Sequence, residues 1–165
     1  QVLTSTGTVW QSEAVPTGDL KVIQIVYDTD SVQYACATDE WGETDKMTTL
    51  EVQITAAGSS SRILLMGQVG ISTQGSGNAI ALDFYKDADD LAETYNLSGK
   101  NSGFGFLESA SGGSLQQQQN IFMVDTANTE EEITYSISFR GSDTSTMYVA
   151  SINNLSTLIA VEVVL

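Results

Sequence analysis

Apolar side chains in this chain recur at every second residue, which is the spacing of an extended strand and not of a helix. Leu50, Val52 and Ile54 alternate with polar residues, and the segment 133–139 repeats the pattern. Because successive side chains of a strand point to opposite faces, such segments bury one face and leave the other in water. The segment 87–97 is the one candidate for a helical turn, and a solvated loop is the alternative interpretation of it.

Two segments are more apolar than alternation requires. Residues 62–71 begin with an almost unbroken apolar run, which is typical of a strand buried on both faces. Residues 158–165 are interrupted only by Glu162, so we expect a central strand or a strand at a subunit interface. With glycine- and serine-rich turns between them, roughly eight to ten short strands predict an all-β fold of the sandwich or jelly-roll type.

Residues 1–19 differ from the rest of the chain. They contain the single proline and several small polar residues, and they carry too little apolar surface to fold alone. We therefore predict an extended linker or shaft arm over 1–19 and one folded domain over 20–165. An isolated monomer would leave both the arm and the apolar last strand poorly buried. A cyclic assembly would bury both, so we expect one.

The charge of the chain narrows its range of partners. Six basic side chains stand against 21 acidic ones, which gives a net charge of −15. A chain of this charge repels phosphate groups, so nucleic acids and anionic lipid surfaces are poor partners. No apolar run approaches the ~20 residues of a membrane-spanning helix, and we expect no membrane insertion.

Catalytic chemistry finds little support in the residues. Histidine is absent, which removes the most common general base near neutral pH and a common metal ligand. Neighbouring carboxylates arise by chance in so acidic a chain, so we expect no enzyme activity and no cofactor. Asp87, Asp89 and Asp90 place oxygen atoms in one loop and are candidates for calcium binding, with a solvated acidic loop as the alternative.

Four aromatic residues are candidates for ligand binding. Trp41 lies in a polar loop, and Tyr95, Phe104 and Phe106 lie in the long region between the predicted strands near residues 80 and 117. Aromatic side chains stack on sugar rings and anchor protein interfaces. The alternative for each of them is that it packs on the core and holds its loop in place.

The order of several motifs resembles the C-terminal head domains of marine and cyanobacterial phage tail-fibre-like proteins. The opening residues 1–11, with Trp10, resemble the linker that precedes such heads, and 50–66 resembles their most distinctive piece. In that piece a polar-faced strand leads through a serine-rich turn into a basic residue and an aliphatic strand. The segment 87–116 and the acidic turn 129–132 depart from the family pattern. Further matching segments are 21–26, 81–87, 122–139 and 156–163.

The resemblance implies a jelly-roll-like antiparallel β-sandwich that is trimeric about the fibre axis. It implies a virion structural protein on the particle surface, which binds a host surface glycan or protein and joins other virion proteins through its N-terminal arm. It implies no catalysis and no cofactor. A capsid decoration or head-fibre protein and a glycan-degrading appendage domain are the alternative functions.

Overall fold

Antiparallel strand pairing accounts for all the regular structure in the residues that the structure describes, which confirms the predicted all-β fold. This computed structural model describes residues 2–5, 10–13, 20–35, 46–73, 79–87, 89–90, 105–108, 115–141, 147–149 and 155–164. Within those ranges there is no helix that could cross a membrane. The strands are β1 (Val2–Ser5), β2 (Trp10–Glu13), β3 (Lys21–Asp30), β4 (Tyr34–Ala35), β5 (Lys46–Thr55), β6 (Arg62–Thr73), β7 (Ala79–Lys86), β8 (Asp89–Asp90), β9 (Gly105–Glu108), β10 (Leu115–Thr126), β11 (Glu132–Gly141), β12 (Met147–Val149) and β13 (Ser156–Val164).

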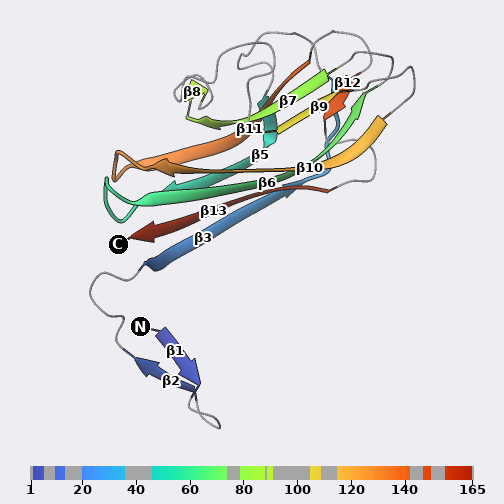
Figure 1. Ribbon diagram of the computed structural model, residues 1–165. Coiled ribbons are helices and arrows are strands. Elements are labelled where there is room, and N and C mark those ends of the chain that lie inside the picture. Colours follow the sequence, from blue (N-terminus) through green and yellow to red (C-terminus); the bar gives the residue numbers. More distant parts are fainter. Residues whose placement is uncertain are drawn as a thin grey trace.

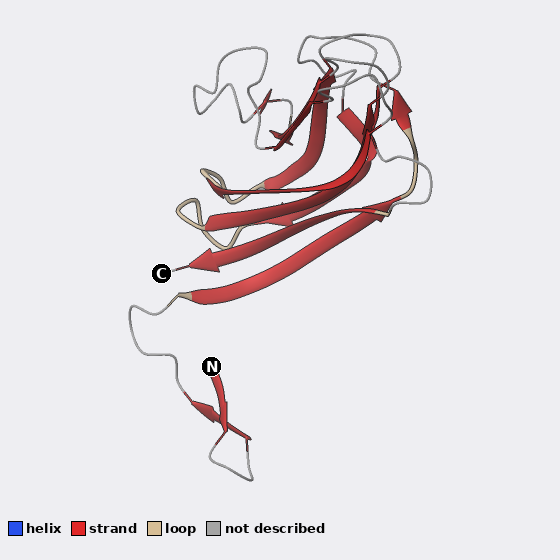
Figure 2. Ribbon diagram, turned by 45° about the vertical axis from the view of Figure 1, so that its right-hand side comes forward, coloured by secondary structure: helices blue, strands red, loops and turns tan. Residues whose placement is uncertain are grey.

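Two sheets face each other in the arrangement of a β-sandwich (Figures 1 and 2). In the first, the β6 sheet, β10 pairs with one edge of β6, while β13 and then β12 pair with its other edge. Strand β3 lies outside β13, and β4 lies outside β12. In the second, the β11 sheet, β11 lies between β5 and β7, and β8 and β9 both pair with the far edge of β7.

Strands β1 and β2 form a separate hairpin within the segment predicted as an arm (Figure 1). They pair with each other from Val2 opposite Glu13 to Ser5 opposite Trp10, and with no other described strand. The sequence pattern did not indicate these strands, because four-residue segments are too short to show a clear alternation. A two-stranded hairpin is marginally stable by itself in water.

The core lies between the two sheets and follows the predicted alternation. Leu50, Val52 and Ile54 are buried, as are the alternating apolar residues of β7 and β11. On the β6 sheet the inward positions are the odd-numbered residues of β6, and Gly67 occupies one of them. A Cβ atom at Gly67 would lie 2.8 Å from Ile137 Cδ1 on the opposite sheet, so the two sheets meet closely at this point.

The helical turn considered over 87–97 is not formed in the part of it that the structure describes. Asp87 has a left-handed backbone with a φ of 53°, and the next described residues form β8. The Asp87 and Thr134 backbones are joined by a hydrogen bond of 2.7 Å from the Asp87 N–H to the Thr134 carbonyl. A left-handed residue ends one strand and starts a turn, which is incompatible with continuing helix.

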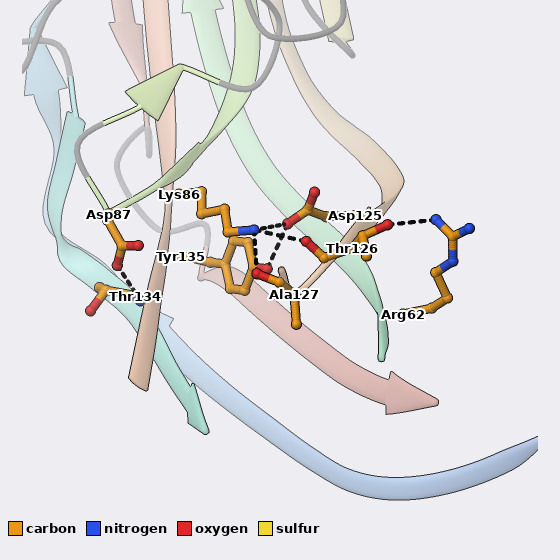
Figure 3. A network of polar contacts seen from close by, with 8 residues as sticks. All are labelled: Arg62, Lys86, Asp87, Asp125, Thr126, Ala127, Thr134 and Tyr135. Atoms are coloured by element: carbon orange, nitrogen blue, oxygen red, sulfur yellow. Dashed lines mark hydrogen bonds and ion pairs between the residues drawn. The ribbon is translucent and has the colours of Figure 1, made fainter. Parts of the chain in front are cut away.

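A buried ion pair links the two sheets at one edge of the sandwich (Figure 3). Lys86 Nζ on β7 donates to Asp125 Oδ2 on β10 at 2.9 Å, and to the backbone carbonyls of Thr126 and Ala127 at 2.8 and 2.9 Å. The Tyr135 hydroxyl donates to the same Asp125 oxygen at 2.8 Å. The ammonium group thus has three acceptors, and the carboxylate is shared between two donors, as a buried pair requires.

Two further carboxylates link the sheets at the opposite edge. Glu162 of β13 is fully buried, and accepts hydrogen bonds from Gln24 Nε2 and from the Ala57 N–H, each at 2.7 Å. Asp30 of β3 accepts hydrogen bonds from the hydroxyls of Tyr34 and Thr49. Since Ala57 and Thr49 belong to β5 or the turn after it, each carboxylate ties the β6 sheet to the β11 sheet.

The pKa values of these two carboxyls follow from the same contacts. Burial raises the pKa of Asp30, but its hydrogen bonds from Thr49, Val32 and Tyr34 outweigh burial and hold the pKa below the ordinary 3.8. Burial likewise raises the pKa of Glu162, and its hydrogen bonds bring the pKa below the ordinary 4.5. A lowered pKa in the folded state means that the unfolded chain binds these protons more readily.

Acid is therefore expected to weaken the fold through Asp30 and Glu162. Their contribution to the free energy of unfolding is fully present above pH 4.5 and is lost as the pH falls through 4.5 and below 3.8. Urea unfolding across this pH range measures the loss. A variant with Asp30→Asn and Glu162→Gln should show a flatter dependence on pH, and parallel curves for the two proteins would contradict the assignment.

The predicted central position of the last strand is confirmed, whereas the predicted burial of β6 on both faces is not met within a single chain. Strand β13 lies between β3 and β6, so it is a central strand. Strand β6 was expected to be buried on both faces, but Leu64 and Met66 on its outer side are only partly covered. The inward side chains of β6 are thus buried by this chain, while the outward side chains stay partly exposed to solvent.

Candidate assembly surface

The outer face of the β6 sheet, turned away from the core, carries two complete rows of apolar side chains. Residues that lie directly opposite each other on antiparallel strands point to the same side, so the strand register defines each row. One row runs across β3, β13, β6 and β10 through Tyr27, Ile159, Met66 and Phe122. The next row runs through Ile25, Val161, Leu64 and Val124. We call these eight residues the apolar patch.

The ends of both rows are strongly exposed. Tyr27 is 73% exposed, Phe122 69%, Ile25 61% and Val124 52%, and these side chains stand on the two outer strands, β3 and β10. On the central strands Leu64, Met66 and Ile159 are partly covered by their neighbours, and Val161 is buried. Single exposed apolar residues are ordinary, but a contiguous apolar patch marks an interaction surface.

The described outer face carries no carboxylate, although the chain has 21 acidic residues. The four acids on strands β3, β6, β10 and β13 all contact the β11 sheet or its turns instead. Asp28 accepts a hydrogen bond from the Glu51 N–H of β5 at 3.2 Å, and the other three make the contacts given above. The one charged side chain on these strands' outer face is Arg62, whose Nη1 donates to Thr126 Oγ1 at 2.6 Å.

Beyond the apolar patch the face becomes polar but stays uncharged. The next row consists of Thr29, Thr157, Gln68 and Asn120, and Gln68 Nε2 donates to Asn120 Oδ1 at 3.1 Å. Further along β10 the outward positions are glutamines, and Gln118 Nε2 reaches the Leu155 carbonyl at 3.4 Å. On this side the face therefore passes from the apolar patch to amides and hydroxyls.

A hollow of about 340 Å³ lies where these two parts of the face meet. Its apolar side is formed by Met66, Phe122 and Ile159, and its polar side by Gln68, Asn120 and Thr157, with Gly67 and Ile121 between them. Such a mixture suits a group with an apolar body and a polar tip, as a tyrosine side chain has.

Most of the ligand-binding candidates from the sequence cannot be placed. Trp41, Tyr95 and Phe104 lie outside the described residues. Phe106 belongs to β9, where its backbone pairs with Ala81, and its side chain is outside the description.

The acidic candidates for calcium are only partly placed. Asp87 Oδ1 accepts a hydrogen bond of 2.9 Å from the Thr134 N–H (Figure 3), while Asp89 and Asp90 form β8 with side chains outside the description. Among the side chains that the structure describes, no group of three or more metal-ligating residues occurs.

The sequence analysis expected cover on both faces of the β6 run and allowed a subunit interface for the last strand, but it did not identify the exposed patch residues of β3 and β10. A usable signal was present in β10, where Ile121, Phe122, Met123 and Val124 are apolar on both faces of one strand. The same holds for residues 63–66 of β6. Alternation identifies the face that enters the core, but four successive apolar residues also require cover on the second face.

Comparison with protein-family models finds no match to this chain, and comparison with curated proteins finds none either.

Proposed function

We propose that this chain is the head domain of a bacteriophage fibre or a similar virion appendage. It acts as a jelly-roll-like homotrimer on the particle surface and binds a glycan or protein of the host cell envelope. It is a structural and binding module without catalytic activity or cofactor. Its N-terminal arm joins it to other virion proteins.

The observation that carries this proposal is the uncovered outer face of the β6 sheet. A permanent subunit keeps apolar surface for its neighbours, and obligate interfaces resemble a domain core cut in half. The apolar patch, with partly buried central strands and exposed outer strands, has this character. A part of a virion functions only within such an assembly.

The remaining features fit the same role. The resemblance to phage fibre heads extends in order along nearly the whole chain, and the all-β, antiparallel fold agrees with it. The net charge of −15 disfavours nucleic acid as the partner. An attachment protein also needs little affinity per site, because many copies on one particle multiply weak contacts.

Antibody labelling of phage particles that carry this gene tests the proposal. Gold particles at the tips of fibres, together with competition of the purified protein against adsorption to the host, are the expected results. Labelling over the shell would favour a capsid decoration protein instead. Loss of host polysaccharide viscosity on adding the protein would favour a glycan-degrading appendage domain.

A further inference from the structure

The charge of this chain limits what can cover the apolar patch. A membrane surface with anionic lipids repels a chain of net charge −15, and so does a second acidic protein that approaches carboxylate to carboxylate. The described outer face is the one side of the β6 sheet on which two copies of this chain could meet without opposed carboxylates. The placement of all four acids of these strands toward the other sheet therefore favours a second copy as the occupant.

The size of the face also fits a protein interface. One further row, of Val22, Val163, Arg62 and Thr126, borders the apolar patch on the side away from the Thr29 row. At ordinary strand and residue spacing, the four strands from this row to the row of Thr29 project an area of roughly 500 Å². Accessible area exceeds projected area, because side chains stand out from the sheet. A standard interface takes about 800 Å² of accessible surface from each partner.

The row of Tyr27, Ile159, Met66 and Phe122 has an exposed tyrosine at one end and a hollow at the other. These two different surfaces could meet when two copies of the chain associate. Tyr27, the most exposed member of the patch, stands on β3 at one side of the face. The hollow beside Phe122 lies toward β10 at the other side and offers apolar walls with amide and hydroxyl groups at its polar end. Identical chains that associate through two different surfaces form a closed ring when the rotation from one copy to the next adds up to a full turn.

We infer that the apolar patch is covered by a second copy of this chain, and that Tyr27 of one copy enters the hollow beside Phe122 of the next. Its ring packs on Met66, Phe122 and Ile159, and its hydroxyl reaches the amides of Gln68 and Asn120. This inference rests on the proposed homotrimer and deepens it by naming the surface through which the copies associate.

Single charge substitutions test the surface. Light scattering after size exclusion at micromolar concentration should show a trimer for the wild-type chain and a monomer for Phe122→Asp and for Tyr27→Asp. Both side chains are interface anchors of the kind whose loss weakens association by about 30-fold or more. Gln53→Asp, which adds the same charge on the exposed face of β5, should stay a trimer.

A cysteine pair tests the predicted contact itself. Cys36 is the single cysteine of the chain and is first replaced by serine. Tyr27→Cys and Phe122→Cys, combined in that background, should give covalent trimers under mild oxidation. Within one chain the two positions are separated by three strand spacings, about 14 Å, and a disulfide needs Cα atoms within about 7 Å. Either cysteine alone should give no crosslink, and dimers from Phe122→Cys alone would show a two-fold contact and overturn the inference.

The outcomes separate this inference from the proposed function. A trimer that survives both charge substitutions would overturn the inference and leave the virion role to be judged by antibody labelling. A wild-type chain that is monomeric, or that instead binds neutral lipid vesicles, would also overturn it. Folding of each variant is checked by circular dichroism, and the crosslink answers the question even if one charged variant aggregates.

Discussion

Replacing Asp125 with alanine is expected to lower the free energy of unfolding by about 3–5 kcal/mol, because it leaves a buried ammonium group without its counter-ion. Lys86 and Asp125 have side chains only 15% and 5% exposed, so solvent compensates poorly for the lost contact. The Tyr135 hydroxyl loses its acceptor in the same substitution. Both sheets contribute to the pair, so we expect the whole sandwich to be destabilised.

Equilibrium unfolding in urea measures this effect, at one fixed protein concentration because assembly couples stability to concentration. Glu130→Ala is a matched control, since it also removes one carboxylate near the β10–β11 turn but from an exposed position. Its expected effect is within about 0.5 kcal/mol. Equal effects of the two substitutions would show that the ion pair does not hold the sheets together.

Truncation of two phenylalanines should separate the core from the assembly surface. Phe84 is fully buried on β7, and Phe84→Ala is expected to lower the free energy of unfolding by about 3–5 kcal/mol. Phe122 is exposed on the outer face, so Phe122→Ala should barely change the unfolding of the dissociated chain. It should instead weaken association between copies, because the side chain is one wall of the hollow.

The two readouts are urea unfolding of dilute protein and sedimentation at increasing concentration. The substitutions remove the same atoms, so a difference between them reports only where each ring lies. A Phe122→Ala protein that unfolds as easily as Phe84→Ala would place Phe122 in the core. If the Phe122→Ala protein associates as strongly as the wild type, Phe122 does not contribute to the interface.

The local sequence pattern was sufficient to predict the main strands and the face of each strand that points into the core. The period of two along β5 and β11 follows from strand geometry alone, so Val52, Ile54, Ile133 and Tyr135 could be assigned to the core without a partner strand. For the last strand, the nearly unbroken apolar run predicted either a central strand or a strand at a subunit interface, and the structure shows the central position.

Contacts between distant segments were not predictable in this way. Lys86 and Asp125 are 39 residues apart, and Glu162 meets Ala57 across 105 residues. Nothing in the local sequence marks which of 21 acids is buried and which is solvated. The aromatic residues chosen as ligand candidates were selected because they lie in polar loops, whereas the exposed aromatic pair of the described surface stands on strands.

The amino-acid sequence by itself determined that this chain forms antiparallel strands and which side of β5 and β11 is inward, because backbone geometry imposes that period on every strand. Only the tertiary structure decided which apolar faces find cover within the chain. Burial depends on what lies across from a strand, and the outer side of the β6 sheet has Tyr27, Met66 and Phe122 in one row with no described element above it. The same folding turned the acids of those strands toward the opposite sheet, and so left that face without carboxylates.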